Sequence, residues 1–107
     1  MTAAAFNFRH AEKLYRLEPR AQFVCAVEDE LGPLPQLAAR FRSHEWRMTE
    51  LIALIQMFLQ ACGEQADFYA LGDDILRTGL AAPLSTARLF LAPFDTAATP
   101  DTKGQKP

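Results

Sequence analysis

Residues 50–62, ELIALIQMFLQAC, constrain the fold of this chain more than any other stretch. No charged residue interrupts the run after Glu50, and its large apolar residues recur at the spacing of one broad helical stripe. Gly63 follows, and glycine often ends a helix because it adopts the left-handed conformation easily. The run is far shorter than the roughly 20 apolar residues that span a bilayer. It therefore predicts the buried central helix of a small soluble domain, with a stripe made of Leu51, Ile52, Leu54, Ile55, Phe58, Leu59 and Cys62.

Length and composition allow one domain with a real core. The chain has 107 residues, of which 50% are hydrophobic. Its net charge of −2 argues against a protein built to neutralise nucleic-acid phosphates. We expect residues 1–94 to form a single domain. Residues 95–107 contain no large apolar side chain, so we expect a disordered tail there.

The N-terminal region has the alternating pattern of two short strands. Phe6 and Phe8 flank a polar residue, and Leu14 and Leu17 flank a second alternating piece after the polar segment RHAEK. A lone hairpin is only marginally stable in water. We therefore predict a β-hairpin that lays a face made of Phe6, Phe8 and Leu14 on the helices.

Two helices are predicted between this hairpin and the central helix. Pro19 suits a first helical position, and the sequence Gly32-Pro33 ends the first helix. The expected buried face of that helix is Phe23, Val24, Val27 and Leu31. A short helix over residues 36–41 would bury Leu37 and Phe41.

The remaining helices are predicted from their capping residues. Thr49 is the expected cap of the central helix, and Asp67 is the expected cap of a helix over residues 68–78 that ends at Gly79. A last helix over residues 82–91 would bury Leu84, Ala87, Phe90 and Leu91. These elements predict an α+β fold, with the hairpin packed on a small bundle of about four helices.

Residues with reactive side chains form no recognisable catalytic set. His10 and His44 lie in polar connecting segments, while Cys25 and Cys62 lie among apolar helical neighbours and are expected to be buried, reduced thiols. No metal-ligand spacing or glycine-rich phosphate loop occurs, so we expect no enzyme activity, no cofactor and no metal. Residues 1–5 lack the basic start of a signal peptide, so we expect a cytoplasmic protein without membrane contact.

One basic cluster surrounds two aromatic residues. Its members are Arg40, Arg42, His44 and Arg47, placed around Phe41 and Trp46. The first interpretation is a helix connection with inward aromatics and solvated arginines. The second is a protein interface, for which arginine and tryptophan are favoured anchors. Nucleic-acid binding ranks third. Arg40, Arg42 and Trp46 are therefore candidate partner contacts.

The order of these elements also resembles a known family. A polar hairpin ending in KLYRL precedes LPQLAARF, Trp46, the helix TELIALIQMFLQACGE and a final helix that opens with GLAA and ends near Phe94. Over residues 4–94 the chain is similar to the tail assembly chaperones of gene transfer agents and siphophage-like or prophage tail modules. The resemblance implies a non-enzymatic factor that binds the tape-measure protein and helps other tail proteins assemble. Such chaperones are generally absent from the finished particle.

A chaperone for helical clients needs exposed apolar surface. Met57, Phe68, Phe90 and Phe94 lie at the edges of predicted stripes or near helix ends, so they are candidate contacts. The same residues could instead belong to the core, and self-association is possible. The alternative function is a small DNA-binding regulator of the helix-turn-helix type that uses residues 40–47, although a net acidic chain disfavours it. A third is a small enzyme subunit or adaptor.

Overall fold

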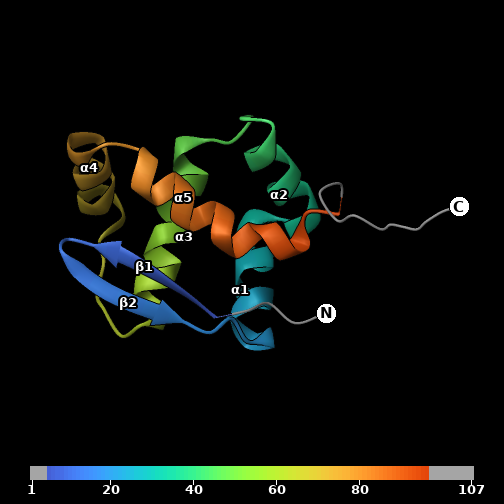
Figure 1. Cartoon of the computed structure of the whole chain (residues 1–107), viewed down its shortest axis with the longest axis horizontal. Coiled ribbons are helices and arrows are strands. Elements are labelled where there is room, and N and C mark those ends of the chain that lie inside the picture. The colour runs from blue at the N-terminus through green and yellow to red at the C-terminus, as the bar shows by residue number, and fades with distance from the viewer. Residues whose placement is uncertain (1–4, 97–107) are drawn as a thin grey trace, which may run out of the picture.

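A computed structural model describes residues 5–96 and shows an α+β fold, as predicted. A two-stranded antiparallel hairpin precedes five α-helices and a short 3-10 helix in the described region (Figure 1). The elements are β1 (Phe6–His10), β2 (Lys13–Leu17), α1 (Ala21–Leu31), α2 (Leu34–Arg42), α3 (Met48–Ala61), α4 (Phe68–Thr78), α5 (Ala81–Leu91) and η1 (Ala92–Phe94). None of these helices is long and apolar enough to cross a membrane.

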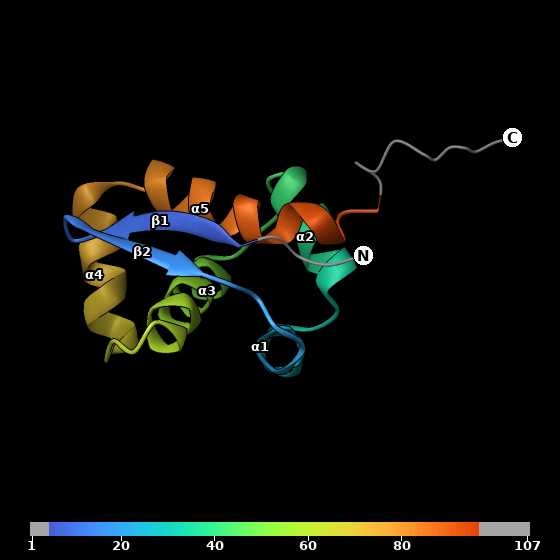
Figure 2. The same cartoon turned by 60° about the horizontal axis from the view of Figure 1, so that its bottom comes forward.

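The predicted central helix is α3, and the other elements pack around it. Leu51, Leu54 and Phe58 have no solvent exposure, because α1, α4 and α5 all contact this helix. Figure 2 shows the hairpin lying over α3. The stripe is buried as predicted, except that Cys62 follows the helix and is only partly buried. The ring of Phe58 contacts rings from β1, α1 and α5, which makes it the meeting point of the core.

The hairpin forms, but one residue of its predicted inner face is wrong. A two-residue turn joins the strands and pairs Phe8 with Tyr15 and Arg9 with Leu14. Successive side chains on a strand point to opposite faces, so this register sends Leu14 outward. It is 61% exposed. Tyr15 takes the inner position, where its ring stacks on Phe8 at a centroid distance of 5.3 Å.

Three helices differ from the prediction at their N-terminal ends. Pro19 precedes the N-cap of α1 and is not its first residue, because Arg20 holds the cap position. α2 begins at Leu34, earlier than predicted, and the Leu34 N–H donates to the Glu28 carboxylate at 3.0 Å. The cap of α3 is Arg47 and not Thr49. The carboxylate of Glu50 accepts the Arg47 N–H at 3.0 Å, which satisfies a donor that the helix itself leaves unpaired.

The C-terminal half follows the prediction more closely. The Asp67 carboxylate accepts the Ala70 N–H at 2.9 Å, and α4 has the predicted bounds. Gly79 ends α4 with φ 110°, a conformation that favours glycine. Asp95, assigned by the sequence to the tail, is 6% exposed and its carboxylate lies 2.7 Å from Arg42 Nε. The rest of the predicted tail, from residue 97, lies outside the described residues.

Candidate protein-interaction surface

The helix α5 is apolar on two opposite faces. Ala87, Phe90 and Leu91 are at most 1% exposed and belong to the core. The residues on the other side recur at the spacing of a second helical stripe and line a shallow surface hollow. We call them the α5 outer stripe: Ala81, Leu84, Ser85, Arg88, Leu89 and Ala92. On the outer side Leu89 is 52% exposed, whereas Leu84, which the sequence predicted to be buried, is partly buried and packs against the core.

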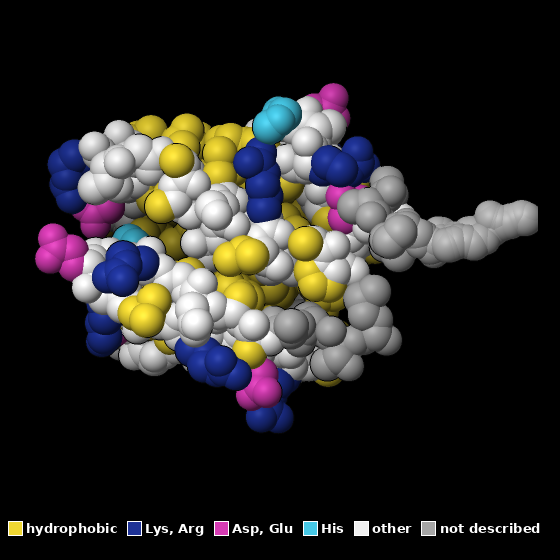
Figure 3. All heavy atoms as spheres, viewed as in Figure 1, with side chains coloured by type: hydrophobic (Ala, Val, Ile, Leu, Met, Phe, Trp, Pro, Cys, Tyr) yellow, Lys and Arg dark blue, Asp and Glu magenta, His cyan; other side chains and the backbone are white. Residues whose placement is uncertain are grey.

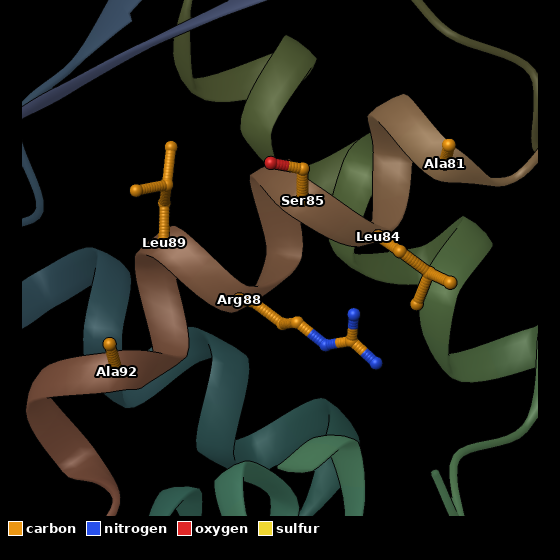
Figure 4. Close-up of a pocket in the computed structure, with 6 residues that line it drawn as sticks. All are labelled: Ala81, Leu84, Ser85, Arg88, Leu89 and Ala92. Carbon is orange, nitrogen blue, oxygen red and sulfur yellow. The ribbon is translucent and has the colours of Figure 1, made fainter.

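The hollow exists because small side chains separate the larger ones. Leu84 and Arg88 extend from one flank of the helix, whereas Ser85 and Leu89 extend from the other (Figure 4). Helices pack by fitting a ridge of side chains into such depressions. In Figure 3, hydrophobic side chains gather on the face of the molecule that α5 crosses. The arrangement can therefore receive another helix through van der Waals contact and apolar burial.

A second hollow of about 370 Å³ adjoins the stripe on the side of α2. The two hollows share Arg88 and Ala92, so the surface continues from α5 onto α2. Arg88 Nη2 lies 3.0 Å from His44 Nδ1 and 3.4 Å from the Phe41 carbonyl oxygen, to which it donates. The apolar stripe therefore ends beside basic and polar groups.

The predicted basic cluster is largely tied into the fold. The guanidinium of Arg40 forms two hydrogen bonds with the Glu50 carboxylate at 2.8 and 2.7 Å, and Arg42 pairs with Asp95. The hydrogen bonds from Arg40 hold the pKa of Glu50 below its usual value. The Trp46 ring stacks on Phe41 at 5.9 Å. This geometry supports the first interpretation, a helix connection, and it neutralises charge that a nucleic-acid site would need.

The comparison with known families decides the broad identity. A model of the family described as "Phage tail tube protein, GTA-gp10" matches residues 3–94. The chain belongs to this family. Neither the curated proteins nor the solved structures give a significant match. Membership ties the protein to the tails of phages or gene transfer agents, as the resemblance implied. The family description names a structural component of tails and not an enzyme.

None of the four apolar contacts predicted for this GTA-gp10 family member is fully exposed. Met57, Phe68 and Phe94 are partly buried and pack against the core. Phe90 is 1% exposed because its ring lies between Phe58 and Phe94, at 5.3 and 5.5 Å, so it is a core residue and not a surface contact. Sequence reasoning missed the α5 outer stripe, although the spacing over residues 81–92 carried the signal.

The reactive side chains of the GTA-gp10 family member are dispersed. Cys25 is exposed, contrary to prediction, because it lies off the inward side of α1, where Val27 is the buried residue. Cys62 is partly buried and lies 3.6 Å from the Arg16 carbonyl oxygen, and burial raises the pKa of its thiol. Within residues 5–96, no three His, Cys, Asp or Glu side chains are grouped so that they could hold a metal ion.

Proposed function

We propose that this protein is a tail assembly chaperone that binds helical segments of another tail protein and keeps them soluble during assembly. The tape-measure protein is the proposed client. The observation that carries the proposal is the α5 outer stripe, where Leu89 is 52% exposed and Leu84 is partly buried, on a helix whose opposite face is anchored in the core. An amphipathic client helix can lay its apolar face on such a surface.

The size of the stripe suits a complex that must later dissociate. α5 has 11 residues and is therefore ~16 Å long and ~10 Å wide. Contact with one helix would bury on the order of a few hundred Å² on each partner, below the area of most stable complexes. A chaperone has to release its client as the tail forms. A small interface on a single helix meets that requirement.

The second candidate function is a tail tube subunit, which the family description favours. A tube subunit would need complementary surfaces that close into rings and stack into a filament. The two functions differ in where the protein ends up. A chaperone leaves before the particle is complete, whereas a tube subunit stays in it in many copies.

Co-expression with the tape-measure protein of the same tail gene cluster tests the proposed function. We expect the client to be soluble with the wild-type chain and to precipitate without it. In the Ser85→Gln/Leu89→Gln double variant, glutamine fills the hollow and removes exposed apolar surface, so rescue should be lost. Tyr69→Gln is the matched control, because Tyr69 is 77% exposed on α4. A client that precipitates equally with and without the folded wild-type chain refutes the proposal.

Mass spectrometry of purified particles separates the two candidates. The chaperone assignment predicts that this chain is absent from finished particles, or present only in trace amounts. Stoichiometric recovery with the other tail proteins would instead assign it to the tube. Formation of rings or tubes by the purified chain alone would lead to the same conclusion.

A further inference from the structure

The charge within the α5 outer stripe indicates what kind of helix it receives. We propose that the client helix carries an aspartate or glutamate within its apolar stripe, and that this carboxylate binds Arg88. This inference rests on the proposed function. The occupant is thus an amphipathic helix with one acidic residue on the flank that faces α2.

Arg88 has hydrogen-bonding capacity that the fold does not use. A guanidinium has five N–H donors. Its contacts with His44 and the Phe41 carbonyl both involve Nη2. Within residues 5–96, Arg88 forms no ion pair with a carboxylate, although Arg40 and Arg42 both do. A carboxylate brought by a partner could therefore form the paired, two-point contact for which arginine is suited.

The surroundings hold this guanidinium at the edge of the stripe. His44 follows the end of α2 with φ 64°, a left-handed conformation that histidine tolerates better than most residues. Its Nδ1 lies 3.0 Å from Arg88 Nη2. Figure 4 shows Leu84 and Arg88 on the same flank of α5. The acidic residue of the client would therefore lie beside the apolar residue that contacts Leu84.

Charge and composition disfavour two other possible occupants, which are a second copy of this chain and the chain's own residues 97–107. The stripe contains no carboxylate, so two copies packed stripe to stripe would bring two Arg88 side chains together without an acid. Like charges at an interface weaken association. The chain's own residues 97–107 contain no large apolar side chain that could fill the hollow. A partner with both apolar and acidic residues complements the surface better than either of these.

Binding of synthetic helical peptides that tile the tape-measure protein tests the inference on the full-length chain. We expect the binding peptides to contain an acidic residue in their apolar stripe. Arg88→Glu should weaken binding about tenfold or more, since close charge pairs contribute strongly to affinity. A peptide with the acid changed to lysine should bind Arg88→Glu better than it binds the wild-type chain. Arg16→Glu on exposed β2 is the matched charge-reversal control.

Arg88→Gln provides a second variant that keeps the size of the side chain but not its charge. The wild-type complex should weaken as salt is added, and the Arg88→Gln complex should have lost that dependence. Thermal melts of each variant check that the domain is folded.

The outcomes separate this inference from the proposed function. If Ser85→Gln/Leu89→Gln abolishes peptide binding while Arg88→Glu leaves it unchanged, the inference of an acidic partner is refuted and the chaperone proposal stands. If neither the peptides nor the intact tape-measure protein binds the wild-type chain, the chaperone proposal itself fails. A wild-type dimer that dissociates on Leu89→Gln would show that a second copy occupies the stripe, and would overturn the inference.

Discussion

Replacing Phe58 by alanine should remove a large part of the stability of the domain. Phe58 has no solvent exposure, and its ring centroid lies 5.6 Å from Phe6, 6.1 Å from Phe23 and 5.3 Å from Phe90. A phenylalanine buries roughly 150–250 Å², worth about 4–6 kcal/mol at ~25 cal/mol per Å². Alanine keeps the Cβ, so we expect a loss of about 3–5 kcal/mol. A whole domain has only about 5–15 kcal/mol.

Urea unfolding followed by circular dichroism measures this loss. Phe58→Leu, which retains most of the volume, should cost distinctly less than Phe58→Ala. Tyr69→Ala removes an aromatic ring at a 77% exposed position and should change the unfolding free energy by no more than about 0.5 kcal/mol. If Phe58→Ala lowered the unfolding free energy by less than about 1 kcal/mol, the reasoning that places this ring at the centre of the core would be refuted.

Three further predictions concern the periphery of the fold. Glu12→Gly should stabilise the hairpin by about 0.5–1 kcal/mol in urea unfolding, because Glu12 has φ 65° and glycine removes that strain. Glu50→Gln should destabilise the domain at neutral pH. Pairing with Arg40 lowers the pKa of Glu50 below 4.5. The pair therefore contributes to stability above pH 4.5, and this contribution is lost at lower pH. The melting temperatures of wild type and variant should converge at that lower pH. Deleting residues 97–107 should leave the melting temperature nearly unchanged, whereas a deletion that starts at Asp95 should lower it by removing the partner of Arg42.

The central helix could be predicted from sequence because hydrophobic periodicity depends only on local geometry. The register of the hairpin could not. Its two-residue turn is Ala11-Glu12, and both residues have positive φ values of 50° and 65°. Such turns usually contain asparagine or glycine, so the sequence carried no turn signal. Without the turn, the pattern allowed Leu14 to face inward, when the register in fact places Tyr15 there.

Helix caps could be predicted where the capping residue is of a common type. Asp67 was predictable because its carboxylate accepts an N–H within its own helix. The start of α3 depends instead on Glu50, which accepts the Arg47 N–H and also pairs with Arg40 on α2. That second contact exists only once α2 and α3 are packed. Arginine is not a residue type that usually caps a helix, so the sequence favoured Thr49 over Arg47.

The interaction surface was hard to predict for a further reason. Because apolar residues occur on both sides of α5, periodicity alone does not say which side enters the core. Packing against β1, α2 and α3 buries the side with Phe90 and leaves Leu89 exposed. An exposed apolar stripe promotes aggregation unless a charge interrupts it. Arg88 lies within this stripe and interrupts it, and the acidic partner that we propose would bind the same guanidinium.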